Sequence, residues 1–263
     1  MQRPDTLVVT ATLGTRPTLD RTIDSVKKIG GDRVRHVIVA PAKACPALRE
    51  KYSHLTVIEE PQNCKGIYSA LNFGLKSFAN DHKYLTYIND DDFWCPGFKE
   101  LFHAMDHSNL DIAYGRVNFV DSSGQLIKEQ ASSPHHKQFG NLLSKGIVLF
   151  TQQATLSRSK LFIKLGGFDE NYKLVSDTKF WLEALRSNAN FKYVNNICAN
   201  YTIQEGQLSS NKSLQMMEHE SLLQSIQPHS KLKPIFSVIA FRAWNFKVYL
   251  KRIINTKKQQ IIS

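Results

Sequence analysis

An alternation of short β-branched apolar runs with segments of helical period restricts the fold more than any other feature of the sequence. Residues 7–12, LVVTAT, form a run typical of a buried strand. Apolar residues then recur at helical spacing over 19–29, and Gly30-Gly31 ends that helix. Residues 34–40 form a second buried-strand run. A strand, helix, strand unit of this kind predicts the start of a parallel sheet.

The same alternation continues along most of the chain. We expect further strands over 55–58, 84–88, 111–120 and 151–156, and helices over 67–78, 97–107, from 159, and over 176–186. The pattern predicts an α/β fold, with a Rossmann-like, mostly parallel sheet flanked by helices. At 263 residues the chain has room for one such domain and an appendage. We place the domain at 1–226 and a basic helical tail at 227–263.

The positive charge is concentrated in that tail. The formal net charge is +11, yet the first 226 residues hold 26 Lys/Arg against 23 Asp/Glu, and the tail holds eight Lys/Arg and no acid. A charge excess confined to a tail argues against nucleic acid as a partner and favours an anionic surface.

Apolar residues of the tail recur on one helical face. Opposite them lie Lys247, Lys251 and Arg252, whereas Arg242 falls near the apolar side. This pattern predicts an amphipathic helix that lies in a membrane interface. The alternative is a helix that packs on the domain and exposes its basic face. The apolar face consists of Ile235, Ile239, Phe246, Leu250 and Ile253.

The cysteines and the hydropathy indicate a compartment. Four cysteines stand far apart without a CxxC pair, which favours reduced thiols over a zinc site or a disulfide framework. No uncharged apolar run approaches the roughly 18 residues that a membrane span needs. We therefore expect a cytoplasmic protein, peripheral on the inner face of the cell membrane.

Three aspartates, Asp90 to Asp92, follow directly on the strand expected at 84–88, in the stretch YLTYINDDDFW. Ligands of open α/β sheets bind at the carboxyl ends of the strands. Adjacent carboxylates repel one another, and a divalent ion such as Mg²⁺ or Mn²⁺, which prefers hard oxygen ligands, would remove that repulsion. Acid/base chemistry and simple surface polarity are the alternatives.

Three segments in a fixed order resemble family 2 glycosyltransferases of the GT-A fold. They are GIYSALNFGL, YLTYINDDDFW and TQQATLSRSKLFIKLGGFDENYKLVSDTKFWL, and the similarity covers about residues 6 to 210. The resemblance implies an inverting hexosyltransferase that uses a nucleotide-sugar donor and Mn²⁺ or Mg²⁺. It further implies a glycan or polyprenyl-diphosphate-linked acceptor, in the synthesis of O-antigen, capsule or another bacterial surface polysaccharide.

The resemblance also assigns residues to the donor side of the site. Asp91 is the first choice for the metal ligand, with Asp90 and Asp92 as alternatives within the acidic motif. The residues implied at the donor are Thr10, Ala11, Thr12 and Arg16 after the first strand, Gly66, Ile67 and Asn72 in GIYSALN, and Asn89 and Asp90 in the acidic motif.

On the acceptor side, the resemblance implies that Asp177, in VSDTKFW, is the general base. An inverting transfer needs one base to take the proton of the attacking hydroxyl, and a metal on the diphosphate removes the need for a separate acid. Asp177 also suits the first turn of the helix that follows it, and the two roles are compatible. Asp169 is expected to order the GGFD turn.

The chain departs from the family pattern at two places. Relatives carry an acid after the second strand that meets the nucleotide base, whereas this chain has Ala40 and Pro41. Gln152 stands where histidine is common, so Gln153 is the better match. The identity of the donor therefore stays open. A scaffold that has lost catalysis is the main alternative, and a nucleotidyltransferase fits poorly because LGTRP lacks a glycine-rich basic loop.

Overall fold

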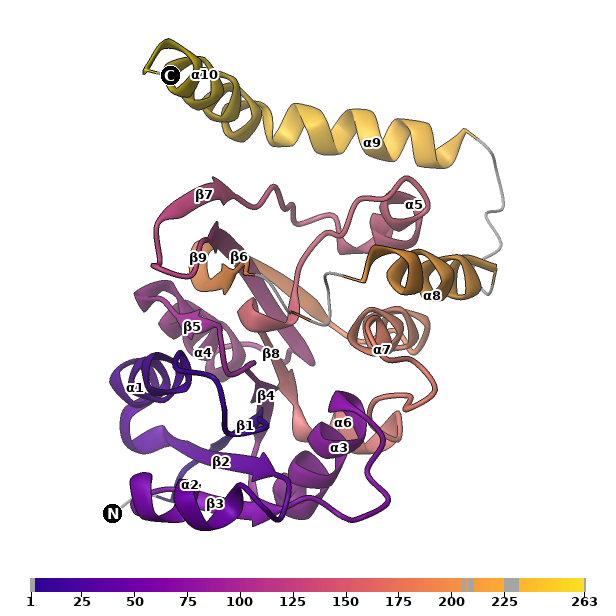
Figure 1. Cartoon of the computed structure of the whole chain (residues 1–263). Coiled ribbons are helices and arrows are strands. Elements are labelled where there is room, and N and C mark those ends of the chain that lie inside the picture. The colour runs from indigo at the N-terminus through magenta and orange to yellow at the C-terminus, as the bar shows by residue number, and fades with distance from the viewer. Residues whose placement is uncertain (1–2, 205–206, 208–210, 225–231, 263) are drawn as a thin grey trace.

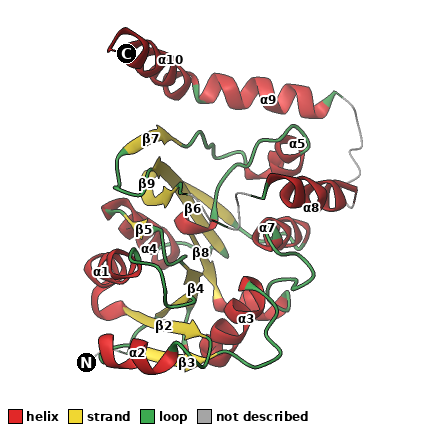
Figure 2. Ribbon diagram, viewed as in Figure 1, coloured by secondary structure: helices red, strands yellow, loops and turns green. Residues whose placement is uncertain are grey.

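Nine strands in the described part of the chain form one curled sheet with helices on both of its faces (Figure 2). The computed structural model describes residues 3–204, 207, 211–224 and 232–262, with the backbone alone over 255–262. The strand order is β3-β2-β1-β4-β8-β6-β9-β5, and β7 pairs with β6. The strands are β1 Thr6–Ala11, β2 Val34–Ala40, β3 Thr56–Glu59, β4 Tyr84–Tyr87, β5 Phe93–Trp94, β6 Ile112–Val120, β7 Leu126–Glu129, β8 Thr155–Arg158 and β9 Phe191–Thr202.

The first half of the sheet is entirely parallel. Strand β1 pairs with β2 and β4 on its two sides, with Thr6 opposite Val34 and Tyr84, and β3 follows beyond β2. Strands of a parallel sheet are covered on both faces and are therefore apolar throughout. Leu7, Val8 and Val9 accordingly have no exposed surface. The prediction of a parallel α/β sheet is confirmed for this half.

The second half is mixed. Strand β8 runs antiparallel between β4 and β6, while β9 lies parallel to β6. The short strand β5 pairs with β9, and β7 forms a hairpin with β6. The helices are α1 Leu19–Gly30, α2 Cys45–Lys51, α3 Ile67–Phe78, α4 Lys99–Asp106, α5 Phe139–Leu143, α6 Ser159–Lys164, α7 Ser176–Arg186, α8 Lys212–Gln224, α9 Lys233–Trp244 and α10 Phe246–Ile262.

Alternate residues of each central strand face different helix layers, because successive side chains of a strand point to opposite faces. Leu7 and Val9 belong to the core that includes Leu71 of α3, while Val8 belongs to the core that includes Val26 of α1. Each such side chain contributes about 1.5–3 kcal/mol by its burial. Because helices connect the parallel strands β1, β2 and β4, the carboxyl ends of these strands meet at one edge of the sheet.

Several expected elements coincide with the observed ones. Strand β2 and helices α3 and α7 have the predicted limits of 34–40, 67–78 and 176–186. The strand predicted over 151–156 was wrong in its first half, because Gln152–Ala154 forms a 3-10 turn and the strand begins at Thr155. The sequence patterns gave no prediction for β9, α2, α5 or α8, or for the short strands β5 and β7.

The described part of the tail, residues 232–262, contains two helices rather than the single helix that the periodicity over 235–254 suggests. Asn245 separates α9 from α10, and its side chain accepts a hydrogen bond from the Ser132 amide (3.1 Å) and donates one to the Phe241 carbonyl (2.9 Å). Both helices lie at one end of the molecule, with α9 beside α5 (Figure 1). Among the described residues, no helix has both the length and the hydropathy needed to cross a bilayer.

Candidate active site

The aspartates lie where the carboxyl ends of β1 and β4 meet. These strands are hydrogen-bonded neighbours, and the pairing continues past β4, since the Ile88 amide donates to the Val9 carbonyl at 3.0 Å. The chain then turns through 89–92 before β5. Parallel pairing therefore brings the acidic motif beside the loop that follows β1.

Asp90 is held by that loop. The Thr12 hydroxyl donates to Asp90 Oδ2 at 2.6 Å, and Arg16 Nε lies 3.2 Å from Asp90 Oδ1. The Thr18 hydroxyl donates to the Asp90 carbonyl at 2.9 Å. Burial raises the pKa of Asp90, against the opposing effect of the Thr12 hydrogen bond. The acidic motif and the loop after β1 thus form one polar cluster.

Asp91 faces a second segment, which follows strand β9. Gln204 Nε2 donates to Asp91 Oδ2 at 3.1 Å, and Gln207 Nε2 donates to the same oxygen at 2.9 Å. Arg16 Nη1 lies 3.4 Å from this oxygen, so its guanidinium contacts both Asp90 and Asp91. Oδ2 of Asp91 is therefore the point at which the loop after β1 and the segment after β9 converge.

Asp92 is buried, with 1% of its surface exposed. Its Oδ2 accepts hydrogen bonds from Gln153 Nε2 (2.7 Å) and Asn89 Nδ2 (3.2 Å), and its Oδ1 accepts one from the Thr202 amide (2.8 Å). Burial, and next the charge of Asp91, raise the pKa of Asp92 to about 8. The two Asp92 oxygens already accept hydrogen bonds from the turn before β8, from Asn89 and from the end of β9.

The donor set fits a metal ion held by few protein ligands. Within the described residues, no cluster of three or more His, Cys, Asp or Glu side chains is arranged around a common metal position. Mg²⁺ and Mn²⁺ in nucleotide sites bind one or two carboxylates and take their other ligands from phosphates and water. Asp91 and Asp90, which share Arg16 as a partner, match that requirement, whereas Asp92 is committed to other partners.

The residues predicted after the first strand divide into two groups. Thr12 and Arg16 reach the acidic motif. The Thr10 side chain instead points away into the layer below α1, where its hydroxyl lies 2.9 Å from Nε2 of the buried His36. Ala11 packs against the core on the α3 side. Thr10 and Ala11 can therefore meet a nucleotide only through their backbone.

The residues predicted in GIYSALN divide in the same way. Gly66, with φ of +88°, precedes the first turn of α3 and is exposed, and Ile67 packs partly against the core. Asn72 is buried, and its amide contacts Phe168 and Glu170 in the loop that leads to α7. Asn72 therefore positions that loop, and its amide group is bound there rather than to the acidic motif.

Two further side chains hold the same loop just before α7. Glu218, on α8, accepts hydrogen bonds from the amides of Lys173 (2.7 Å) and Leu174 (2.8 Å). The Tyr68 hydroxyl donates to the Leu174 carbonyl at 3.2 Å. With Asn72, these contacts fix the backbone that delivers Asp177, and the sequence patterns did not indicate Glu218 or Tyr68.

Asp177 lies in the first turn of α7, as the helical pattern predicts. Its Oδ1 accepts a hydrogen bond from the Thr178 amide at 2.6 Å. Burial raises the pKa of Asp177 to about 6, although the Thr178 and Tyr68 hydrogen bonds lower it. A carboxylate with this pKa is ionised at neutral pH and still accepts a proton readily, which suits a general base.

Tyr87 connects the two halves of the site. Burial raises its pKa well above the usual value, and the neighbouring charges of Asp177 and Asp92 raise it further. A small cavity of about 30 Å³ is lined by Tyr87, Gln152 and Asp177. Tyr87, the last residue of β4, is therefore close to the candidate base and to the last aspartate of the acidic motif.

Gln204 and Gln207 are site residues that the sequence patterns missed. They follow directly on β9, which lies parallel to β6, so they leave the sheet at a strand's carboxyl end. That position is the one feature that could have identified them, and it depends on recognising β9. Gln153, matched from the family pattern, contacts Asp92.

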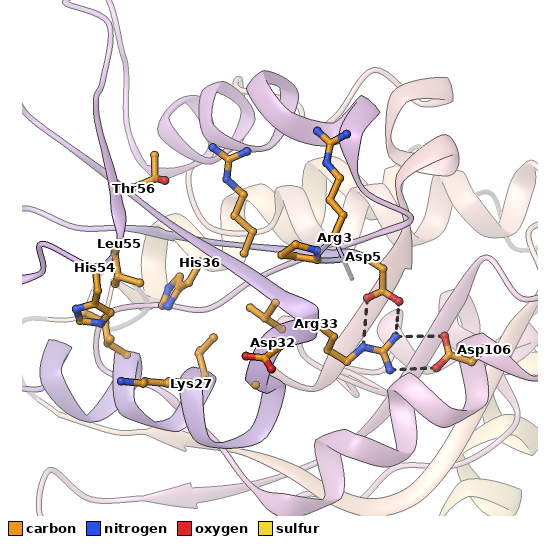
Figure 3. A pocket seen from close by; sticks show the side chains of 16 residues that line it. Arg3, Asp5, Lys27, Asp32, Arg33, His36, His54, Leu55, Thr56 and Asp106 are labelled. Carbon is orange, nitrogen blue, oxygen red and sulfur yellow. Dashed lines mark hydrogen bonds and ion pairs between the residues drawn. The ribbon is translucent and has the colours of Figure 1, made fainter. Parts of the chain in front are cut away.

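A larger cavity, of about 920 Å³, lies at the other end of the strands (Figure 3). Its lining includes Asp5, which precedes β1, and Arg33, whose guanidinium bridges Asp5 and Asp106. His36 also lines it, and burial lowers the His36 pKa to about 3. The amino ends of parallel strands are not where α/β sheets bind substrates, and Arg3 and Arg33 in the lining are paired with aspartates.

Solved structures share this architecture. Staphylococcus aureus TarS 1–349 in complex with UDP-GlcNAc superposes with a TM-score of 0.62 at 18% identity, over 79% of this chain and 61% of that one. The mannosyltransferase PcManGT of Pyrobaculum calidifontis, in complex with GDP-Man and Mn²⁺, gives 0.56 at 14% identity, over 92% and 70%. The chain thus spans about three fifths of the TarS 1–349 structure. These likenesses define the fold as GT-A, as predicted.

The sequence gives the family. Residues 7–166 match the model of glycosyl transferase family 2, and the chain belongs to that family. The predicted membership of glycosyltransferase family 2 is therefore confirmed. No protein with a curated function matches the chain in sequence.

Proposed function

We propose that this chain is an inverting, metal-dependent glycosyltransferase that moves a sugar from a nucleoside-diphosphate sugar to an acceptor hydroxyl. One observation carries the proposal: Asp90 and Asp91 lie together at the carboxyl ends of β1 and β4, and Asp177 lines a small cavity with Tyr87, the last residue of β4. A transfer with inversion needs charge stabilisation on one side of the anomeric carbon and a base on the other.

Asp91 and Asp90 form the leaving-group half. They would hold Mn²⁺ or Mg²⁺, which when bound offsets the charge of the departing diphosphate. Thr12 orients Asp90, and the two glutamines after β9 orient Asp91. Arg16 adds a cation beside both carboxylates. Support for this donor class comes from neighbours of the same fold that bind UDP-GlcNAc and GDP-Man.

Asp177 forms the acceptor half. The acceptor oxygen attacks the anomeric carbon from the face opposite the nucleotide, and the bond between that carbon and the phosphate oxygen breaks. Asp177 takes the hydroxyl proton, and the nucleoside diphosphate leaves with the bonding electrons. The loop contacts of Asn72, Tyr68 and Glu218 hold this base in place.

We further propose that the acceptor is a glycan or a polyprenyl-diphosphate-linked sugar, in the synthesis of O-antigen, capsule or another surface polysaccharide. We place the protein in the cytoplasm, on the inner face of the membrane. The free state of Cys45, Cys64, Cys95 and Cys198 agrees with a reducing compartment. Ala40, buried at the end of β2, leaves no acid there for the nucleotide base, and this favours the alternative of a scaffold without catalysis.

The decisive experiment uses the purified protein with UDP-, GDP- and dTDP-sugars in the presence of Mn²⁺ or Mg²⁺. A nucleotide that binds the native state raises the melting temperature, and slow hydrolysis of the matching sugar donor releases nucleoside diphosphate. We expect both effects to require metal and to be lost in Asp91→Ala. Release that is unchanged in this variant would refute the metal assignment, and no binding across the whole panel would favour the scaffold.

A further inference from the structure

The outward faces of α9 and α10 carry exposed apolar side chains, which we call the outer ridge. All of its members are between 44% and 66% exposed. Ile235 and Ile239 in α9, and Phe246, Leu250 and Ile253 in α10, recur at intervals of three or four residues, so each helix carries an exposed apolar stripe. The outer ridge consists of Ile235, Phe236, Ile239, Phe246, Leu250 and Ile253.

The opposite faces of the same helices attach them to the domain. Ser237 and Phe241 are buried there, and the Ser237 hydroxyl accepts a hydrogen bond from Asn141 of α5 at 3.2 Å. Asn245 binds the Ser132 amide, and Lys251 Nζ donates to Glu129 at 3.2 Å. The apolar stripe is therefore not the surface by which the tail packs on the domain, and it remains exposed.

Cations border the outer ridge. Lys233 and Lys247 are exposed beside it. Arg242 lies on the ridge itself, three residues after Ile239 and four residues before Phe246. No acidic residue occurs between 227 and 263 to neutralise them. A long cationic side chain within an apolar stripe suits a lipid interface, where its stem lies along the apolar region and its charge reaches the phosphates.

We infer that the outer ridge docks on the surface of a bilayer that contains anionic phospholipids, with α9 and α10 in the plane of the interface. The inference goes beyond the transfer reaction and does not depend on it. The charge distribution favours this occupant over a second copy of the chain, because two copies meeting ridge to ridge would bring uncompensated cations together. The position of α9 and α10 at one end of the molecule leaves their outward faces accessible to such a surface (Figure 1).

The test measures cosedimentation of the full chain with vesicles of phosphatidylcholine alone or with phosphatidylglycerol added. We expect binding to the anionic vesicles, weakened by salt. The variant Ile235→Gln with Phe246→Gln should lower vesicle affinity by about tenfold or more, because two exposed apolar groups no longer enter the interface. Arg242→Glu should lower it as well, through charge alone.

A matched control replaces Ile163 on α6 and Met217 on α8 by Gln, since these side chains are exposed to a similar extent, 48% and 66%. Its vesicle binding should equal that of the unaltered chain. Equal binding of the ridge variant, or equal binding to neutral vesicles, would overturn the inference. The inference would also be overturned if the unaltered chain formed a dimer and bound no vesicles, and the ridge variant were a monomer. Release of nucleoside diphosphate from a soluble donor should not change in any of these variants, which separates this test from that of the transfer reaction.

Discussion

Asn72 and Phe168 form a reciprocal pair of hydrogen bonds, although they lie 96 residues apart in the sequence. The Asn72 Nδ2 atom donates to the Phe168 carbonyl at 2.7 Å, and the Phe168 amide donates to Asn72 Oδ1 at 2.8 Å. The side chain thus satisfies both backbone groups of a buried loop residue. A residue implied at the donor therefore acts on the loop that carries the candidate base.

This pair predicts the effect of Asn72→Asp. The new carboxylate cannot donate to the Phe168 carbonyl and faces the Glu170 carboxylate. We expect a loss of about 2–3 kcal/mol in the free energy of unfolding, from lost hydrogen bonds and an unpaired buried group. Urea unfolding measures it, with Asn63→Asp at an exposed position as the control. A stability equal to that of the control would contradict the positioning role.

Replacement by asparagine should affect nucleotide binding differently at two neighbouring aspartates, Asp92 and Asp91. Asp92→Asn places an amide against the amides of Gln153 and Asn89, so we expect a loss of about 1–3 kcal/mol of stability. Asp91→Asn removes a carboxylate from the predicted metal site and should abolish metal-dependent nucleotide binding, with a similar loss of about 1–3 kcal/mol of stability, because Asp91 Oδ2 also accepts from two glutamine amides. Calorimetric titration of nucleotide with Mn²⁺ distinguishes the two variants, and urea unfolding measures their stability. If Asp92→Asn also abolished binding at full stability, the division of roles would be wrong.

The pKa of Asp177, about 6, predicts the acid limb of the activity profile. The base must be ionised to accept a proton, so kcat/KM should be level above pH 7 and fall about tenfold per pH unit well below pH 6. Initial rates between pH 4.5 and 8.5, at saturating metal, give the profile. Asp177→Asn should keep nucleotide binding and lose transfer. An acid limb centred near pH 4, where an aspartate ordinarily titrates, would show that the carboxyl group with the raised pKa is not the general base.

Glu218 offers a test of the loop before α7. Glu218→Ala leaves the Lys173 and Leu174 amides without acceptors, so we expect the loop to loosen and kcat to fall by roughly tenfold while nucleotide affinity is unchanged. Glu218→Gln keeps one acceptor and should recover part of the rate. The control is Glu220→Gln, which alters an exposed side chain of the same helix. A fall in nucleotide affinity equal to that in kcat would indicate a general effect on the fold.

The sequence predicts those parts of the fold that depend on local pattern. The apolar period of α7 and the β-branched run of β2 determine their limits, because each buries one regular set of side chains. The turn at 152–154 was predicted as strand because its polar residues have no period that distinguishes the two. The tail was predicted as one helix because its period continues through Asn245, whose partner, Ser132, is 113 residues away.

The sequence likewise predicts some residues of the candidate site but not the contacts that decide their roles. The end of a strand is visible in the sequence, and so are the carboxylates that follow it, which is why the run from Asp90 to Asp92 was identified. Asp177 was assigned through the resemblance to family 2 glycosyltransferases. The role of Asp92 was not visible, because a run of three aspartates does not show which carboxyl group turns inward to Gln153 and Thr202. The functions of Thr10 and Asn72 likewise depend on His36 and Phe168, which only the folded chain brings near.

The contacts of the acidic motif with Thr202 and Gln207 have a consequence for the order of folding. They join residues 110 and 116 positions apart, across nearly half of the chain. Contacts of such long range form slowly, because closing a large loop precedes any gain from the contact itself. During synthesis the parallel half, β1 to β4, can assemble while β9 is still absent. The acidic motif therefore gains the partners that fix Asp92 only after β9 is made and pairs with β6, so the candidate site is completed later than the parallel half of the sheet.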